Sequence, residues 1–251
     1  MKNSALLAGV SLGALMLGSG AVSAASVTLQ VCSASSCWNG SDQIADGAVA
    51  NWSNVENRPN GDGSSVNDWE GTHGLDLSAW SLSMDSDPFV TNNFTITNTT
   101  GSTQTYSLTT TLGIAPAIPN GLMRGSVGFT LTNNSGGSAT LETSGAPIYQ
   151  GVIDGTVART LWDAPTSLTT PATDADSIAF GFPTREGAPE SIDSTIGISI
   201  RFSLTAGDSA AFTSNFDVIP VPLPAALWLF GSGLLGLFGA TRRNARYSEA
   251  V

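Results

Sequence analysis

Two kinds of hydrophobic pattern occur along this chain. Near its ends, apolar residues run almost without interruption over 5–17 and again over 225–240. Between these runs, apolar residues alternate with Ser, Thr and Asn in short segments bounded by Gly, Asn, Pro and Ser. A period of two predicts half-buried β-strands. The expected strands are 27–31, 94–98, 103–112, 126–132, 139–143, 149–157, 177–182, 195–204 and 209–218.

This density of strands predicts one all-β domain over 26–219. Because no helical pattern separates the strands, we expect an antiparallel β-sandwich, with a jelly roll as the nearest alternative. Residues 38–88 differ in composition from the rest of the domain and are rich in Gly, Asn and Asp. We expect them to form long loops over an edge or face of the sandwich, because their apolar content is low for an independent core.

The N-terminal apolar run predicts a secretory signal peptide over 1–25. Lys2 precedes the run, and Val22 and Ala24 are small residues at positions −3 and −1 of a cleavage site. The Sec machinery and signal peptidase are therefore expected partners. The central domain is then exported.

The C-terminal run has the features of a membrane stop signal. At about 1.5 Å per helical residue, 225–240 spans about 24 Å, somewhat less than the hydrocarbon core of about 30 Å. Arg242 and Arg243, with Arg246 close behind, follow the run and are expected on the cytoplasmic side. A proline-rich segment precedes it, made of Val221, Pro222, Leu223, Pro224 and Ala225.

These features in this order resemble the PEP-CTERM sorting signal, in its VPLPA variant with Pro-Leu-Pro in place of Pro-Glu-Pro. The resemblance covers 220–243, with the motif at 221–224, the helix at 225–240 and the arginines at 242–246. It implies a Gram-negative bacterium that makes exopolysaccharide, and a membrane-embedded exosortase that processes the tail near the motif. The alternative is an ordinary C-terminal anchor that is never cleaved.

Charge and cysteine content agree with export. The formal net charge is −11, and Lys2, Arg242 and Arg243 lie outside the central domain, which is therefore more acidic still. Such a surface repels nucleic acid and anionic lipid headgroups, so neither is an expected partner. The two cysteines, Cys32 and Cys37, predict a small disulfide loop in an oxidising compartment. A redox or metal pair is the alternative.

Tryptophans and acids in the loop-rich segment suggest two ligands. Flat rings stack on the apolar faces of sugars, and an exported protein of an exopolysaccharide producer is a natural polysaccharide binder. The alternative role for these rings is to pack irregular backbone against the core. The candidate sugar-stacking residues are Trp38, Trp52, Trp69 and Trp80.

The acidic loop at 60–70 has oxygen ligands suited to calcium but fails the EF-hand pattern. The weak calcium candidates in it are Asp62, Asp68 and Glu70. Solvated turn residues are the alternative, and we expect no cofactor.

Catalytic motifs do not stand out. The chain has a single histidine and lacks zinc-protease, P-loop and dinucleotide-binding signatures, while a carboxylate pair for glycoside hydrolysis stays open. We therefore expect a non-enzymatic structural or adhesive protein. It would be anchored in the inner membrane before processing and then reach the cell surface or exopolysaccharide matrix. A carbohydrate-binding module and a polysaccharide-active enzyme are the alternatives.

Overall fold

The computed structural model describes residues 25–34, 36–44, 49–53, 73–85, 88–221 and 230. Within these ranges, only the backbone is described for 25, 42–44, 49–53 and 78–80. Residues 1–24 of the predicted signal peptide and nearly all of the predicted C-terminal helix lie outside the described residues. Among the described residues, none forms a helix of the length and hydropathy that a membrane span requires.

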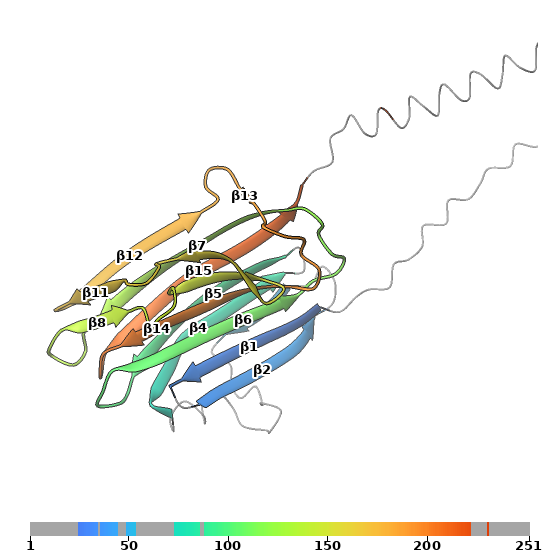
Figure 1. Ribbon diagram of the computed structural model, residues 1–251. Coiled ribbons are helices and arrows are strands. Elements are labelled where there is room, and N and C mark those ends of the chain that lie inside the picture. The colour runs from blue at the N-terminus through green and yellow to red at the C-terminus, as the bar shows by residue number, and fades with distance from the viewer. Residues whose placement is uncertain are drawn as a thin grey trace, which may run out of the picture.

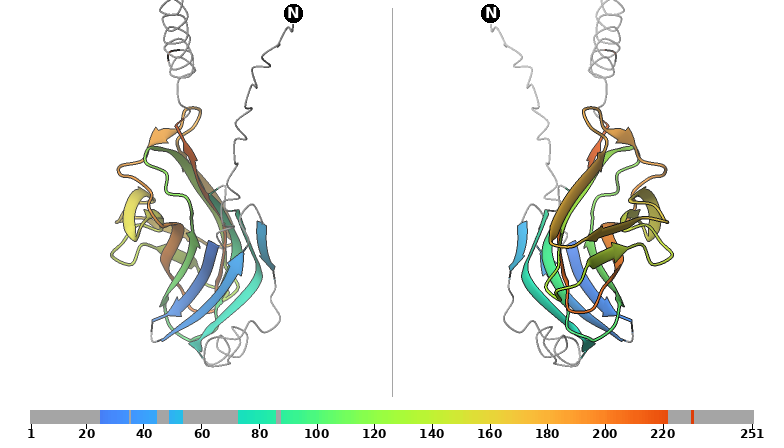
Figure 2. Two further views of the ribbon diagram at one scale, coloured as in Figure 1. Left: turned by 90° about the vertical axis from the view of Figure 1, so that its right-hand side faces the viewer. Right: turned by 90° about the vertical axis from the view of Figure 1, so that its left-hand side faces the viewer.

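Two antiparallel β-sheets face each other and enclose the core (Figures 1 and 2). The first sheet has the order β10-β9-β14-β6-β1-β2, with β8 also on β14 and β11 on β8. Its strands are β1 (Ala25–Ser33), β2 (Ser36–Ile44), β6 (Gln104–Gly113), β8 (Ala139–Glu142), β9 (Tyr149–Ile153), β10 (Thr156–Leu161), β11 (Ser167–Thr170) and β14 (Thr195–Leu204).

The second sheet has the order β12-β7-β15-β5-β4-β3, with the short β13 on β7. Its strands are β3 (Val49–Ser53), β4 (Leu75–Asp85), β5 (Phe89–Asn98), β7 (Gly121–Thr132), β12 (Thr173–Phe180), β13 (Glu186–Gly187) and β15 (Ser209–Pro220). The central strand β15 pairs with β5 on one side and with β7 along its whole length on the other. The predicted all-β, antiparallel two-sheet fold is confirmed.

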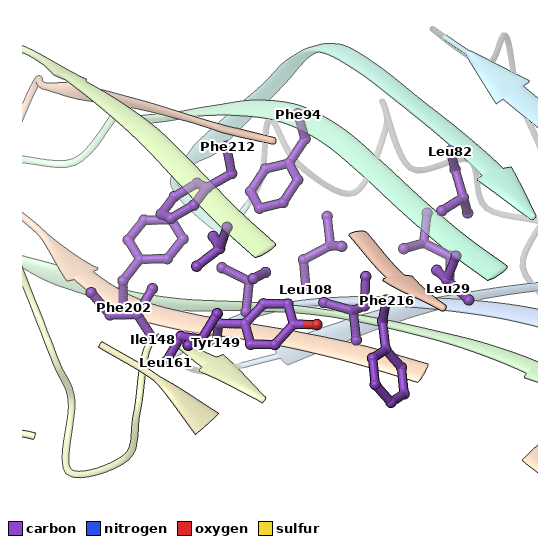
Figure 3. Close-up of a cluster of buried hydrophobic side chains, with 14 of the residues drawn as sticks. Leu29, Leu82, Phe94, Leu108, Ile148, Tyr149, Leu161, Phe202, Phe212 and Phe216 are labelled. Carbon is purple, nitrogen blue, oxygen red and sulfur yellow. The ribbon is translucent and has the colours of Figure 1, made fainter. Parts of the chain in front are cut away.

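The core forms because residues of one parity in each strand point between the sheets. In β7, buried and partly exposed positions alternate without a break over 12 residues. Aromatic rings from both sheets meet in the middle (Figure 3). Phe212 of β15 lies 4.7 Å from Phe202 of β14 and 5.1 Å from Phe94 of β5, measured between ring centroids. These contacts hold the two layers in register.

Two buried tyrosines also join the layers by hydrogen bonds. The hydroxyl of Tyr149 on β9 donates to the backbone carbonyl of Asn215 on β15 over 2.9 Å. The hydroxyl of Tyr106 on β6 donates to the carbonyl of Gly74, just before β4, over 2.8 Å. Burial raises the pKa of both phenols, and the charge of nearby Asp217 raises that of Tyr149 further. Both therefore stay protonated and remain donors.

The beginning of β1 and the end of β15 lie at the same end of the sandwich, at the right in Figure 1. Val27 pairs with Leu112, at the end of β6, and Pro220 pairs with Gly121, at the start of β7. A short connection over 114–120 joins these two strands. We call this end the exit pole and the opposite end, with the β5–β6, β7–β8 and β14–β15 turns, the far pole.

Several predicted strands have different limits in the structure. The predicted strand 149–157 is wrong, because Asp154 and Gly155 form a two-residue turn with φ of 49° and 80°, and the chain folds back into the β9–β10 hairpin. Asp-Gly is typical of this turn. The predicted loops over 38–88 also differ, since the described parts of that segment contribute β2, β3 and β4. Their polar outer positions weaken the alternation, and pairing with neighbouring strands decides their conformation.

Candidate functional site

The disulfide is the one sequence-predicted site that the structure bears out directly. Cys32 and Cys37 are bonded to each other across the β1–β2 hairpin, where they are directly opposite residues. The alternative of a redox or metal pair is not needed to explain them. In the described part of the chain, no three or more His, Cys, Asp or Glu side chains gather where they could hold a metal ion.

Trp38 is wholly buried and packs in the core, so it presents no ring to a sugar. The core role considered for it is the observed one. Trp69 and the side chains of Trp52 and Trp80 lie outside the described residues, as do the calcium candidates Asp62, Asp68 and Glu70.

Of the sorting motif, the structure describes Val221, which is 44% exposed just past the end of β15. Pro222, Leu223, Pro224, Ala225, Arg242 and Arg243 lie outside the described residues.

The outer face of the second sheet carries a regular array of small polar side chains. On the central strand β15, the outward positions are Ala211, Thr213, Asn215 and Asp217. The outward neighbours on β5 are Thr95, Asn93, Thr91 and Phe89, in the same order. Those on β7 are Thr130, Gly128, Ser126 and Arg124, and β12 adds Ala175, Ser177 and Ala179 beside the first three of them. Among these outward positions, charged side chains are therefore confined to the row of Asp217 and Arg124. The edge strand β12 also carries two exposed carboxylates at its intervening positions, Asp174 and Asp176.

Two shallow hollows adjoin along β15 and together form what we call the trough. One hollow, of about 340 Å³, lies over Gly128, Ala211 and Thr213, and residues 175–177 of β12, including the carboxylate of Asp176, form its wall. The other, of about 470 Å³, has Phe89, Thr91, Arg124, Phe182, Asn215 and Asp217 as its lining residues. Consecutive outward positions of β15 line both, and from Ala211 to Asp217 the strand advances about 20 Å.

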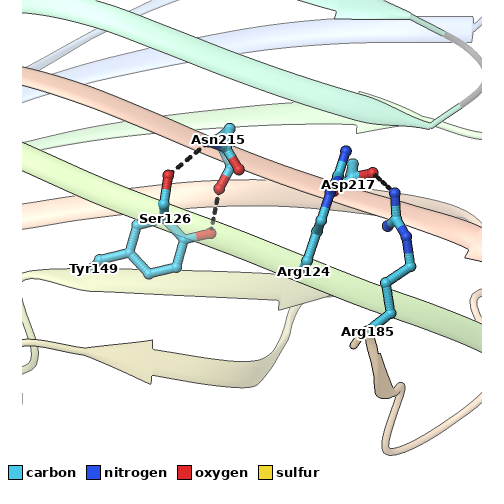
Figure 4. A network of polar contacts seen from close by, with 6 residues as sticks. All are labelled: Arg124, Ser126, Tyr149, Arg185, Asn215 and Asp217. Carbon is cyan, nitrogen blue, oxygen red and sulfur yellow. Dashed lines mark hydrogen bonds and ion pairs between the residues drawn. The ribbon is translucent and has the colours of Figure 1, made fainter. Parts of the chain in front are cut away.

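The exit-pole end of the trough is closed by a charged cluster (Figure 4). Asp217 accepts a hydrogen bond from Nε of Arg124 over 2.8 Å and binds Nη2 of Arg185 through its other oxygen. Asp217 and Arg185 are 17% and 19% exposed, whereas Arg124 is 42% exposed. Nη1 of Arg185 is buried and has no hydrogen-bond partner among the described residues. One carboxylate thus fixes two guanidinium groups beside an open surface.

An exposed aromatic ring lies beside this cluster. Gly181 follows β12 with φ of +72°, and a Cβ there would lie 2.7 Å from the carbonyl oxygen of Met123. Glycine therefore lets the chain turn tightly against β7, and the next residue, Phe182, comes to lie next to Arg124. The guanidinium carbon of Arg124 is 5.3 Å from the centroid of the Phe182 ring, a cation–π contact. Phe182 remains 55% exposed.

Two carboxylates with lowered pKa values, those of Asp154 and Asp208, accept hydrogen bonds from turn residues and stabilise these turns. Burial acts to raise the pKa of Asp154, but hydrogen bonds from Asp193, Ser194 and Thr195 hold it below its ordinary value. Burial likewise opposes the lowering of the pKa of Asp208, which hydrogen bonds from Thr205 and from the 134–135 turn bring about. Both groups are occupied by several donors, and neither lies in the trough.

The outer face of the first sheet is also polar, but many of its side chains are paired with each other. Hydroxyl pairs of 2.9 Å join Thr109 to Ser199 and Thr105 to Ser203, and Gln30 donates to Asn39 over 2.8 Å. Cross-strand pairs of this kind stabilise a sheet. Similar pairs occur on the second sheet, where Asn215 donates to Ser126 over 2.6 Å and Asn93 donates to Ser81 over 3.3 Å.

Sequence reasoning missed the trough, although a signal for it existed. The outward positions of 121–132 and 209–220 are mostly Gly, Ala, Ser, Thr and Asn, which predicts a flat and polar sheet face. What the pattern did not contain is the strand order, which places these two strands side by side and Phe182 at their end.

No family model matches the chain, and no curated protein matches it. Among solved structures, the chain is similar to TmCBM61 in complex with β-1,4-galactotriose, with 11% sequence identity and a TM-score of 0.25 over 70% of this chain and 91% of that one. A TM-score this low supports no conclusion about a shared ligand.

Proposed function

We propose that the chain is an exported surface or matrix protein with a structural or adhesive role, sorted through its C-terminal signal. The observation that supports this best is the common exit pole. Val27 and Pro220 lie at the same end of the sandwich, next to the 114–120 connection. Because β1 begins and β15 ends at this pole, a C-terminal anchor that follows β15 would hold the domain at the exit pole and keep the far pole away from the membrane.

This geometry sets the distance at which the far pole is presented. The strand β15 has 12 residues and runs from the far pole to the exit pole, so it advances about 40 Å at about 3.3 Å per residue. The far-pole turns are therefore held about that far from the anchor. The disulfide between Cys32 and Cys37, on the β1–β2 hairpin at the far pole, suits an oxidising compartment outside the cytoplasm.

Hydrogen bonds hold the far-pole turns in place. The side chain of Asn98 donates to the carbonyls of Ser102 and Leu204, each over 2.9 Å. The carboxylate of Asp208 accepts from the backbone N–H groups of Asn134 and Ser135 over 3.0 and 3.2 Å. The presented surface is therefore preorganised, which lowers the entropic cost of contacts with a partner.

The test is the intact mass of the protein isolated from its own cells, in the wild type and in two proline variants. We expect the wild type to lack the signal peptide and to end near 221–224, with Pro224→Ala leaving the C-terminal segment attached in the inner membrane. Pro220→Ala, just outside the motif, is the matched control and should be processed normally.

Each other outcome has a definite meaning. A wild-type mass that retains the C-terminal segment indicates a permanent anchor and refutes sorting by exosortase. A full-length chain in the cytoplasm, with the signal peptide still present, refutes export altogether.

A further inference from the structure

The trough contains binding groups that the proposed sorting does not use. Its floor is made of small side chains. The amide of Asn93 lies beside Thr213 on one side, and the hydroxyls of Thr130 and Ser177 lie on the other. No hydrogen bond joins the hydroxyls of Thr91, Thr130 or Thr213 to another described residue. At the exit-pole end, Asp217 and Arg124, which are bonded to each other, lie beside the exposed ring of Phe182.

We infer that the trough binds a neutral polysaccharide in an extended conformation, with Phe182 stacking on one sugar ring. The hydroxyl groups of a sugar both donate and accept hydrogen bonds. The hydroxyl and amide groups of the trough can do the same, and its carboxylate can accept them. The C–H face of a pyranose is apolar and fits an exposed aromatic ring. The trough follows β15 for about 20 Å, so it matches a chain molecule rather than a single sugar.

Other classes of ligand fit these groups less well. A peptide that adds a strand needs free backbone N–H and C=O groups at a sheet edge, whereas β15 is paired on both sides along the trough. A nucleic acid needs a basic surface, and the chain is acidic with a formal net charge of −11. An apolar ligand would have to bury the hydroxyl, amide and charged groups that lie between the apolar residues of the trough.

Charge decides between neutral and anionic polysaccharides. The outward rows of Thr91, Asn93 and Thr95 carry no charged side chain across β5, β15, β7 and β12. The charged residue that lines the hollow over Thr213 is an acid, Asp176 of β12. At the end of the trough, the charge of Arg124 is already engaged by Asp217. An anionic polymer would therefore meet the repulsion of the acidic domain without a free cationic row to offset it.

Arg124 has a positioning role in this site. Its Nε is held by Asp217, and its guanidinium group lies against the Phe182 ring. The ring is thereby kept at the end of the trough while 55% of it stays exposed to a ligand. An ordered ring loses less conformational entropy on binding than a freely rotating one.

The test is native gel electrophoresis of the full chain in a mild detergent, through gels that contain hydroxyethylcellulose, dextran or alginate. We expect at least one of the two neutral polymers to retard the protein and alginate not to do so. Phe182→Ala should weaken the retardation on the order of tenfold, as the loss of one aromatic contact with a ligand does. Thr213→Arg, which fills the floor of the trough from a different strand, should weaken it similarly.

Val157→Ala is the matched control, because Val157 is an apolar residue of the first sheet and is 46% exposed. It should bind as the wild type does, and Phe182→Trp should retain binding. Thermal melting of each variant shows whether it is folded. The two blocking variants, Phe182→Ala and Thr213→Arg, lie on different segments of the chain. If one of them does not fold, the other still tests the inference. The inference is overturned if no neutral polymer retards the protein, if alginate alone does, or if a folded blocking variant binds like the wild type. These results do not depend on how the C-terminus is processed.

Discussion

Replacing Asp217 with Asn removes a charge that two arginines share at the end of the trough. Asp217 binds Nε of Arg124 through one oxygen and Nη2 of Arg185 through the other. The asparagine has nearly the same shape and keeps one acceptor oxygen. The substitution therefore tests electrostatics with little change in packing.

The two contacts differ in how far water screens them. A hydrogen bond between charged groups contributes about 1.5–3 kcal/mol when it is shielded. Arg185 and Asp217 are 19% and 17% exposed, so their contact keeps most of this value. Arg124 is 42% exposed, which reduces its contact to about 0.5 kcal/mol. We expect Asp217→Asn to lower the free energy of unfolding by about 2–3 kcal/mol.

Urea denaturation of the full chain in detergent, followed by tryptophan fluorescence, measures this change. We expect Arg185→Gln to cost about 2 kcal/mol and Arg124→Gln about 0.5 kcal/mol. In 1 M NaCl the smaller cost should nearly vanish while the larger one persists, because salt screens exposed charges first. Asp174→Asn, an exposed carboxylate on β12, is the control and should change little. The reasoning fails if Arg124→Gln costs more than Arg185→Gln.

Two further predictions concern the fold. Gly125→Ala would place a Cβ 2.6 Å from the Tyr149 hydroxyl and 2.7 Å from Phe180. We therefore expect it to lower the free energy of unfolding, measured by urea denaturation, by about 1–3 kcal/mol. An unchanged midpoint would show that the neighbouring side chains move away without cost. Because the pKa of Asp154 is lowered in the folded state, its contribution to stability is present at neutral pH and disappears as the pH falls below the unfolded-state pKa of about 4. The loss of stability between pH 7 and pH 3 should therefore be smaller in Asp154→Asn than in the wild type, and equal losses would contradict the assignment.

Strands with clear alternation were predictable from the sequence. The run 195–204 is predicted with the limits that β14 has, and 209–218 falls within β15. Where alternation is weak, the prediction was wrong, as for the 36–44 strand. There the described inward positions are Trp38 and Gly40, of which only Trp38 has a side chain, and pairing with β1 makes the strand. Local pattern is a weak guide when long-range pairing supplies most of the stabilisation.

The candidate site divides in the same way. The bonded cysteines were predictable because a separation of five positions, in a domain expected to be exported, suffices to suggest a short disulfide loop. The trough was not, because its groups come from β5, β7, β12 and β15, which are far apart in the sequence. Trp38, a sugar-stacking candidate by composition, is buried instead. Residue type alone does not tell which side of a strand faces water.

The sequence by itself determined the class of fold, the disulfide and the expectation of export, since these depend on periodicity and on short local motifs. The tertiary structure decided which strands are neighbours, that β1 begins and β15 ends at one pole, and that Phe182 lies beside Arg124 and Asp217. The physical reason is that side-chain alternation fixes which residues are buried, whereas strand order depends on contacts between residues many positions apart.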